Sequence, residues 1–443
     1  STLYIIKKFQ TMKIYFIGIG GIGISALAKY YLKKGHKVYG SDVFDSDIVK
    51  ILQEEGAQIN IGPQTKDNIK DFDLVIYSPA VKKSNEEYME AKKRNIKLLS
   101  YPEALGELSS NMFTIAISGS HGKSTTTTML ALILIEAGLD PTVIVGTKVK
   151  EFGNGNLRVG NSKYLIIEAC EYEDSFLNYN PDIGIILNIE KDHLDYFKNI
   201  ENIKKSFNQF GKQTKKIIIE KEMEKIIDSN NKIVFDRKKT IKPILHIPGK
   251  FNITNAMHAI ITARELGIDD ETSLKALSKF RGTWRRMDID NNSFPFKIIN
   301  DYAHHPTEIK ATLKAVREKY ISQNIYCIFQ PHQYERTFNL FNDFIQTFRE
   351  ALDKNYLNTL VIYPIYTVEG RESEEIKKKV NSEKLVLEIN HQNCIFIKDF
   401  ENAKIFIQDN LKKNDVLIIM GAGDIYNLYI YLLNKKISYE HEK

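Results

Sequence analysis

The stretch from Gly119 to Thr128 has the residue types best suited to phosphate chemistry. It reads Gly-Ser-His-Gly-Lys-Ser followed by four threonines, and it comes directly after an apolar segment at 115–117. A glycine turn between a strand and a helix points backbone N–H groups at a phosphate, and the helix N-terminus adds positive potential. Lys123 can reach terminal phosphates, and the Ser124 hydroxyl can bind a phosphate-bound Mg²⁺. The spacing is shorter than the general G-x-x-x-x-G-K-[ST] pattern, so the alternative is a Gly/Ser turn that begins a Thr-rich helix.

Acidic and imidazole side chains follow two later apolar segments, expected to be strands at 164–169 and 183–189. Glu171 follows the first and His193 the second. Since the carboxyl ends of parallel strands share one sheet edge, both would lie at the same edge as Lys123, where Mg²⁺ could use the carboxylate and phosphate oxygens. The alternatives are a solvated loop acid and a helix-capping histidine.

A second glycine turn, Gly18-Ile-Gly-Gly-Ile-Gly23, follows an apolar strand expected at 14–17. The next expected strand leads to Ser41-Asp42, where a dinucleotide fold carries a ribose-binding acid. Strand and helix patterns then alternate to about residue 109, which predicts a doubly wound parallel domain. The turn alone indicates a phosphate or diphosphate ligand and leaves NAD binding open.

Polar side chains at two sites in the middle of the chain allow two interpretations each. Asn252 and Asn255 begin an amphipathic helix, where they could contact a base edge or cap the helix. Arg285 and Arg286 are adjacent, which suits a phosphate or carboxylate clamp, although a surface charge pair is the commoner explanation.

The last third of the chain places histidines and arginines in loops after expected strands. The residues are Asp301, His304, His305, His332 and Arg336. Adjacent loop histidines favour ligand contact over burial in a core. The strand–glycine turn–helix pattern then occurs a third time at 421–423, which predicts three nucleotide-type α/β domains in series.

Composition limits the classes of function. The net charge of +6 over 443 residues has no basic run with interleaved aromatics, which argues against nucleic-acid binding. Three scattered cysteines favour a reducing compartment over a disulfide framework. No apolar run reaches membrane-spanning length and no signal-peptide pattern is present, so we expect a cytoplasmic protein without a membrane partner. Residues 1–11 precede Met12 and are treated as an extension outside the fold prediction.

Taken in order, these segments resemble the Mur ligase family over nearly all of the chain from Met12. The motifs are GSHGKSTTT, EACEYEDSF, NIEKDHLD, PGKFNITNA, RRM, DYAHHPTEI, FQPHQYERT and MGAGDI, with GIGGIGIS near the start. The resemblance implies three α/β domains: a Rossmann-like UDP-sugar domain (12–109), a central P-loop-type ATP-binding domain (110–290) and a Rossmann-like C-terminal domain (291–443).

The same resemblance implies an ATP-dependent ligase of peptidoglycan synthesis. It would join L-alanine to the lactoyl carboxylate of UDP-N-acetylmuramate through an acyl phosphate, with Mg²⁺ as cofactor and ATP as co-substrate. The third domain would close over ATP, and the protein would be a monomer or weak homodimer. One alternative is a ligase that attaches a tripeptide in cell-wall recycling. Another, from a different class, is an NAD-binding regulator without turnover.

The resemblance also implies a role for each matching residue. The catalytic residues would be Lys123, Glu171, His193, Arg286 and His304. The ATP-binding residues would be Gly119, Ser120, His121, Gly122, Lys123, Ser124, Thr125, Asn252, Asn255, Arg286 and Asp301. The substrate-binding residues would be Gly20, Gly21, Ser41, His305, His332 and Arg336. The metal ligands would be Ser124, Glu171 and His193. Three positions depart from the family pattern: Ser124 replaces Thr, Cys170 replaces an acid, and Phe251 replaces a histidine before Asn252.

Overall fold

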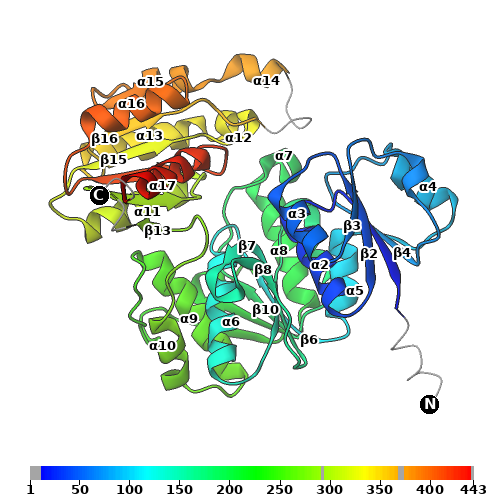
Figure 1. The fold of residues 1–443 in the computed structure, drawn as a ribbon. Helices are drawn as coiled ribbons and strands as arrows, with labels where there is room; N and C mark the ends of the chain where they lie inside the picture. Colours follow the sequence, from blue (N-terminus) through cyan, green and yellow to red (C-terminus); the bar gives the residue numbers. More distant parts are fainter. Residues whose placement is uncertain (1–10, 291–293, 368–373, 441–443) are drawn as a thin grey trace. The chain divides into compact units, whose positions relative to one another are not determined.

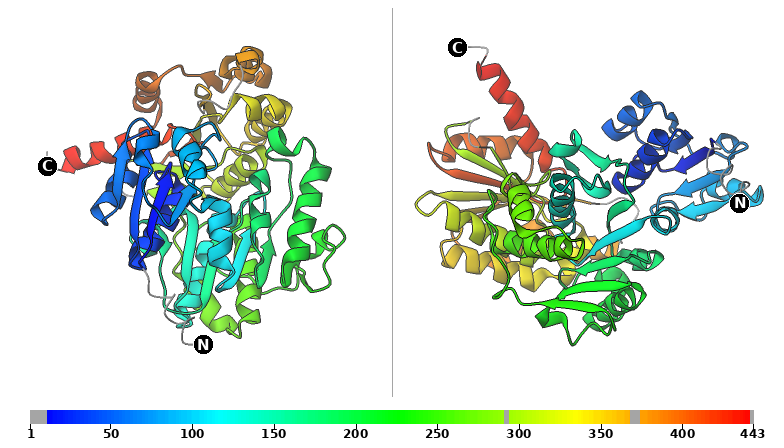
Figure 2. Two further views of the ribbon diagram at one scale, coloured as in Figure 1. Left: turned by 90° about the vertical axis from the view of Figure 1, so that its right-hand side faces the viewer. Right: turned by 90° about the horizontal axis from the view of Figure 1, so that it is seen from below.

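The computed structural model describes residues 11–290, 294–367 and 374–440. The N-terminal extension therefore lies outside the described residues, apart from its last position. The described residues form three β-sheets with helices packed on their faces (Figures 1 and 2). This arrangement confirms the predicted three-part α/β fold.

The first sheet is fully parallel, with strand order β3-β2-β1-β4-β5. Its strands are β1 (Lys13–Ile17), β2 (Lys37–Asp42), β3 (Gln58–Ile61), β4 (Leu74–Tyr77) and β5 (Leu98–Ser100). Its helices are α2 (Ile22–Lys33), α3 (Asp47–Glu54), α4 (Glu86–Lys93) and α5 (Tyr101–Ser109). The strand order reverses between β1 and β4, which is where ligands bind in open α/β sheets. The first glycine turn follows β1 at this point.

The second sheet has the order β12-β11-β10-β6-β9-β7-β8, with only β8 antiparallel to its neighbour. Its strands are β6 (Phe113–Ser118), β7 (Thr142–Val149), β8 (Gly155–Arg158), β9 (Tyr164–Glu168), β10 (Ile183–Ile186), β11 (Lys216–Glu220) and β12 (Lys232–Phe235). The longer helices are α6 (Lys123–Glu136), α8 (Ile200–Gln213), α9 (Lys250–Glu265) and α10 (Asp270–Ser278). Because β6 lies between β10 and β9, their carboxyl ends flank the phosphate turn, as predicted.

The third sheet has the order β13-β14-β18-β15-β16-β17, with only β13 antiparallel. Its strands are β13 (Asp288–Asp290), β14 (Lys297–Asp301), β15 (Ile325–Phe329), β16 (Thr359–Ile362), β17 (Cys394–Phe396) and β18 (Val416–Met420). Its helices are α11 (Pro306–Lys319), α12 (Tyr334–Asn339), α13 (Phe341–Asp353), α14 (Glu374–Lys379), α15 (Ser382–Ile389), α16 (Phe400–Asn410) and α17 (Tyr426–Glu440). The sheet begins with β13, before the boundary expected at residue 291, and residues 291–293 lie outside the described residues.

The chain packs as two compact units. The first contains the first two sheets, and the second contains the third sheet with 191–199, 242–254 and the chain from Ser278. Within the first unit, Asn156 of β8 donates to the Ile22 carbonyl (2.5 Å) and to Ser25 Oγ (3.3 Å), which ties the second sheet to α2.

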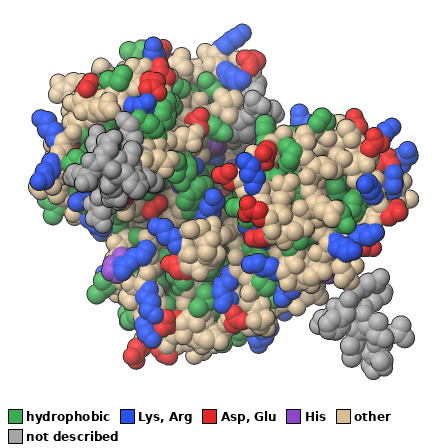
Figure 3. Space-filling view, in the orientation of Figure 1, with side chains coloured by type: hydrophobic (Ala, Val, Ile, Leu, Met, Phe, Trp, Pro, Cys, Tyr) green, Lys and Arg blue, Asp and Glu red, His purple; other side chains and the backbone are tan. Residues whose placement is uncertain are grey.

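The surface shows no segregation of charge on the visible face. Lys and Arg side chains are interspersed with Asp and Glu in Figure 3, as the small net charge leads one to expect. No helix in the described part of the chain has the length and apolar character needed to cross a bilayer.

Candidate functional site

The turn between β6 and α6 has the backbone conformation of a phosphate-binding loop. Gly119 and Gly122 have φ of +140° and +86°, which favour glycine, and Gly122 is the N-cap of α6. A Cβ on Gly122 would lie 2.5 Å from Asn255 Oδ1, so α9 leaves no room for a side chain there. The first N–H groups of α6, from Lys123 to Thr125, have no helical acceptor and face outward from the helix start. Ser124 and Thr125 are both 5% exposed.

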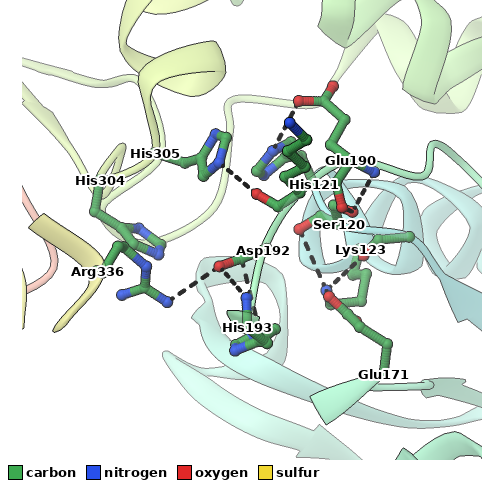
Figure 4. Close-up of polar contacts among 12 residues, drawn as sticks. Ser120, His121, Lys123, Glu171, Glu190, Asp192, His193, His304, His305 and Arg336 are labelled. Atoms are coloured by element: carbon green, nitrogen blue, oxygen red, sulfur yellow. Dashed lines mark hydrogen bonds and ion pairs between the residues drawn. The ribbon is translucent and has the colours of Figure 1, made fainter. Parts of the chain in front are cut away.

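Lys123 folds back over the turn and binds Glu171. Its Nζ donates to the Gly119 carbonyl (2.6 Å) and to Glu171 Oε2 (2.8 Å), as Figure 4 shows. Burial by itself lowers the pKa of Lys123, but the Glu171 carboxylate reverses this and raises it above its usual value. Glu171 is 2% exposed, so it is not a solvated loop acid. Lys123 and Glu171 therefore lie at the same sheet edge, as expected, and they form an ion pair that the sequence did not predict.

Asn188, which sequence reasoning missed, fastens the phosphate turn. Its Oδ1 accepts from the His121 N–H (2.8 Å), its Nδ2 donates to the His121 carbonyl (3.0 Å), and its own carbonyl accepts from the Ser120 N–H (3.2 Å). Two N–H groups expected to surround phosphate are thus held by Asn188. The signal available in the sequence was a polar residue at the end of the apolar run that contains β10 and Leu187.

His193 begins α7 (Leu194–Phe197) with φ +51°, but its side chain makes no capping hydrogen bond. The ring Nε2 lies 3.7 Å from Asp192 Oδ2. Asp192 is 9% exposed and was not among the predicted residues. Burial opposes the charge of Asp192, but His193 and Arg336 outweigh it and hold the pKa of that carboxyl well below its usual range. A helix-capping role does not account for the His193 ring.

Arg336 connects Asp192 to a histidine of the third sheet's loops. Its guanidinium lies 3.4 Å from Asp192 Oδ1, as Figure 4 shows. It also lies 3.1 Å from His332 Nδ1. The His332 ring stacks on Tyr366 with centroids 5.4 Å apart. The second unit therefore brings together Asp192, His332 and Arg336, with His304 beside them (5.9 Å between ring centroids of His304 and His332).

The adjacent histidines His304 and His305 are both held by the backbone. His304 Nδ1 lies 3.0 Å from the Tyr302 carbonyl, and burial lowers the pKa of this ring to about 4. His305 is the N-cap of α11: its Nδ1 accepts from the Thr307 N–H (3.3 Å), while its Nε2 lies 2.9 Å from the Lys191 carbonyl. His305 is 5% exposed, so its local role is structural, contrary to the expectation that loop histidines are chiefly ligand contacts.

The two adjacent arginines differ in environment. The Arg286 side chain is 30% exposed and lies over the Tyr302 ring at 5.5 Å. Arg285 is 6% exposed; its guanidinium lies 4.9 and 4.7 Å from the Tyr302 and Tyr426 rings and donates to the carbonyls of Gly421 (2.6 Å) and Gly423 (3.0 Å). Because Arg285 is buried and bound to two backbone carbonyls, it is neither part of a phosphate clamp nor one of a pair of surface charges.

The third glycine turn is closed by protein groups. Gln330 Oε1 accepts from the Ile425 N–H (2.9 Å), and that oxygen leaves no room for a Cβ on Gly423. Arg285 binds the carbonyls of Gly421 and Gly423, so protein side chains contact this turn at both its N–H and its carbonyl groups. The predicted strand–glycine turn–helix pattern is present here, between β18 and α17.

Asp301, Asn252 and Asn255 also have protein partners. Asp301 accepts from the N–H groups of Met287 (2.9 Å) and Ala303 (2.7 Å), and burial raises its pKa to about 6. Asn252 donates to the Pro248 carbonyl (2.6 Å), while Asn255 abuts Gly122. Phe251 packs against the core of the third sheet.

The first sheet carries a cleft of about 510 Å³ beside its glycine turn. Its lining residues include Gly18, Gly21, Gln64 and Asn85. Gly20 donates its N–H to Asp42 Oδ2 (2.8 Å), so the acid at the end of β2 braces the turn. Ser41 is 1% exposed and lies behind the wall, where it accepts from Gln64 Nε2 (3.0 Å). The Ser41 side chain is therefore placed to support the cleft wall and not to contact a ligand directly.

Oxygen donors near the phosphate turn suit Mg²⁺. Ser124 and Glu171 supply a hydroxyl and a carboxylate from the first unit, and Mg²⁺ prefers such ligands with phosphate and water. His193, in the second unit, offers an imidazole nitrogen, which suits Mg²⁺ less well.

The fold and this site define a three-sheet α/β protein with a lysine–carboxylate pair at its central glycine turn. Three family models match along the chain: Mur ligase family, catalytic domain (13–112), Mur ligase middle domain (117–242) and Mur ligase, glutamate ligase domain (285–423). The chain belongs to the Mur ligase family.

Several relatives share the name UDP-N-acetylmuramate–L-alanine ligase. That of Clostridium kluyveri is 40% identical over 96% of this chain and 99% of its own length. That of Caldanaerobacter subterraneus is 38% identical over 96% and 97%. The crystal structure of the Thermotoga maritima UDP-N-acetylmuramate–alanine ligase matches 98% of this chain and 100% of its own, with a TM-score of 0.78 and 26% identity.

Proposed function

We propose that this chain is an ATP-dependent ligase that joins L-alanine to the lactoyl carboxylate of UDP-N-acetylmuramate in peptidoglycan synthesis. The observation that carries the proposal is the 40% identity, over nearly the full length of both chains, to a relative of that name. ATP phosphorylates the carboxylate to an acyl phosphate. The alanine amine then attacks the acyl carbon, and the tetrahedral intermediate expels inorganic phosphate.

The chain's own contribution to this reaction is positioning and charge compensation around phosphoryl groups. We assign Lys123 to the terminal phosphates of ATP, because its ammonium is already held at the turn beside Glu171. The N–H groups at the start of α6 would accept further phosphate oxygens. Bound at Ser124 and Glu171, Mg²⁺ would supply positive charge to the same oxygens.

In the second unit, we assign roles in binding ATP or the other substrates to four residues: Arg286, His304, His332 and Arg336. Arg286 is the more exposed of the two adjacent arginines, so it is the better candidate for a phosphate contact. Arg336 holds a buried carboxylate and a histidine together, which suits recognition of a small zwitterionic amino acid. Asp301 and Asn252 would act on ATP binding indirectly, by holding the backbone segments to which they are hydrogen-bonded.

The proposal includes three domains, the first ending near residue 109 and the third beginning near β13. It also includes a cytoplasmic location, because the co-substrate ATP is made and consumed there, and a monomer or weak homodimer. The element limits support both domain boundaries. At the first, α5 ends at Ser109 and β6 starts at Phe113; at the second, β13 starts at Asp288.

The test is release of phosphate by the purified chain with ATP, Mg²⁺ and UDP-N-acetylmuramate, with and without L-alanine. We expect release that depends on both acceptor and amino acid. Release with an L-alanyl tripeptide but not with L-alanine would instead identify the cell-wall recycling reaction. Nicotinamide-dinucleotide binding without turnover would support the regulator, and absence of any alanine-dependent release would contradict the proposal.

A further inference from the structure

All three protons of the Lys123 ammonium are already directed at acceptors within the turn and its neighbour Glu171. Lys123 Nζ donates to the Gly119 carbonyl (2.6 Å) and to both oxygens of Glu171 (2.8 and 3.2 Å). The Ser120 carbonyl lies at 3.4 Å. An ammonium has three protons and no lone pair. Lys123 can therefore contact a phosphate oxygen only if it gives up one of these acceptors.

Glu171 is the acceptor that is most costly to give up. The carboxylate is 2% exposed, so water has little access to it. Removing one partner of a buried ion pair is strongly unfavourable, because the other charge stays in a poorly hydrated place. The phosphates of metal-free ATP would draw Lys123 away from Glu171 and would also bring negative charge toward this carboxylate. Metal-free ATP therefore meets two unfavourable terms, the broken ion pair and the repulsion.

The Ser124 hydroxyl offers a second oxygen at the same turn. Ser124 is 5% exposed, yet its Oγ makes no hydrogen bond within the part of the chain that the structure describes. A hydroxyl in so enclosed a place normally has a partner, so Ser124 is suited to bind a ligand at the turn. Together with Glu171 it provides the hydroxyl and carboxylate oxygens that Mg²⁺ prefers beside phosphate and water.

A divalent cation at Glu171 removes the cost of releasing Lys123. Mg²⁺ bound with ATP supplies positive charge to Glu171 and to the phosphate oxygens. Glu171 then keeps a cation when Lys123 leaves it, so no buried charge is left without a partner. Lys123 in turn gains protons for the phosphate oxygens, beside the N–H groups at the start of α6. Glu171 exchanges one cation for another.

We propose that Glu171 is a specificity-determining residue that makes this turn select the magnesium complex of ATP over the metal-free nucleotide. It does so by holding Lys123 in an ion pair until a competing cation takes the carboxylate. The inference rests on the proposed function, which places the phosphates of ATP at this turn. It goes beyond metal binding, because a carboxylate that is only a metal ligand does not withhold Lys123 from ATP.

The experiment measures binding of ATP to the full chain by calorimetry, with Mg²⁺ and with a chelator in its place. Glu171→Gln keeps the size of the side chain and removes its charge. We expect Mg²⁺ to tighten ATP binding at least about a hundredfold in the native protein. In Glu171→Gln, metal-free ATP should bind at least about tenfold more tightly than in the native protein, because Lys123 is then available to the phosphates. The gain from Mg²⁺ shrinks accordingly.

Glu168→Gln is the matched control for charge repulsion. Glu168 ends β9, three residues before Glu171, and its Oε1 accepts from the Gly146 N–H (2.7 Å). The control removes a negative charge from the same sheet edge, leaves an amide oxygen to accept from Gly146 and keeps every hydrogen bond of Lys123. We expect its affinity for metal-free ATP to stay near the native value.

A second variant covers the case in which Glu171→Gln does not fold. Glu171→Asp keeps the negative charge but shortens the side chain by one methylene, which loosens its contact with Lys123. Metal-free ATP should again bind more tightly than in the native protein, by a smaller factor. Repulsion does not explain such a rise, since the charge is unchanged.

Four outcomes overturn the inference. A folded Glu171→Gln or Glu171→Asp with native affinity for metal-free ATP shows that Glu171 does not withhold Lys123. An equal rise in Glu168→Gln shows that negative charge at the edge, and not the ion pair, weakens binding. Equal native affinity with and without Mg²⁺ removes the selectivity, although alanine-dependent phosphate release would still uphold the proposed function. Failure of the native protein to bind ATP in either condition removes both proposals.

Discussion

Two glycine turns, at 119–122 after β6 and at 421–423 after β18, differ in the groups that contact them. At the first, Lys123 and Glu171 face each other across the loop, and Asn188 holds the outer edge. At the second, Gln330 accepts a hydrogen bond from an N–H group just before α17, and the buried Arg285 donates to two carbonyls of the turn.

The difference shows that a glycine turn before a helix is a backbone shape and becomes a binding site only if its polar groups remain accessible. In both turns glycine is required by positive φ and by close neighbours. At 119–122 the close neighbours are Leu187 and Asn188 at Gly119 and Asn255 at Gly122. At 421–423 a carboxamide and a tyrosine ring fill the space in front of the turn, so the same shape serves packing.

Replacing Lys123 by Met tests the functional side of the comparison and has the largest expected effect. We expect a loss of roughly a thousandfold in kcat, because the charge that compensates the transferring phosphoryl group is removed. Phosphate release measures the loss, and UDP binding to the first sheet should persist. The exposed Lys225→Met is the matched control and should keep native activity. Joint loss of UDP binding and turnover in Lys123→Met would contradict the separation of the two sites.

Replacing Arg285 by Met tests the structural side. We expect the free energy of unfolding to fall by about 3 kcal/mol, because two carbonyls lose their donor and the Tyr302 and Tyr426 rings lose a cation. Denaturant titration measures the change. Arg281→Met, an exposed arginine in the same segment, should be nearly neutral. Arg285→Lys should recover only part of the loss, since an ammonium cannot reproduce the planar stacked donor. Equal stability of all these proteins would mean that the third turn does not depend on Arg285.

The pH dependence of stability provides a test at Asp301, whose carbonyl accepts from the Gly421 N–H (3.0 Å) of the third turn. Because burial raises the folded pKa of Asp301 to about 6, above its unfolded value, the folded state binds the proton more tightly. The associated stability is fully present below about pH 4 and is lost as pH rises through about 6.

The measured quantity is the free energy of unfolding of the native protein minus that of Asp301→Asn, at several pH values. We expect this difference to fall by about 2 kcal/mol between pH 4 and pH 7, since one pKa unit corresponds to about 1.4 kcal/mol. A difference that is flat or rises with pH would show that the Asp301 carboxylate is not penalised by burial.

Sequence reasoning predicted most strands of the three sheets because their apolar runs are short, β-branched and bounded by glycine or polar residues. It also predicted that Lys123 and the carboxylate after β9 lie at the same sheet edge, since parallel strand ends share an edge. The hairpin of β7 and β8 and the antiparallel β13 were not predicted, because pairing direction depends on partners that are distant in the sequence.

The rest of the site could not be predicted because it depends on which polar side chains meet in the fold. Arg285 and Arg286 are identical residues in adjacent positions, yet positive φ at Arg285 and the surrounding rings bury one and leave the other partly exposed. The ion pair of Lys123 and Glu171 gives no local signal, since β7, β8 and β9 separate the two residues in the sequence. Which side chains meet across such a distance is a property of the fold and of no single residue.

Replacing Asn188 by Ala has the smallest expected effect. It tests whether the turn at 119–122 is preorganised for phosphate, in contrast to the turn at 421–423. In Asn188→Ala, His121 loses both hydrogen bonds to the Asn188 side chain, while the backbone bond from Ser120 remains. If Asn188 preorganises the loop, KM for ATP should rise roughly tenfold, because the ordering must then occur on binding. Gln330→Ala, the equivalent change at the third turn, should lower stability and leave KM for ATP unchanged. A lower KM for ATP in Asn188→Ala would mean that Asn188 competes with phosphate for the His121 N–H, and both glycine turns would then be closed by a carboxamide.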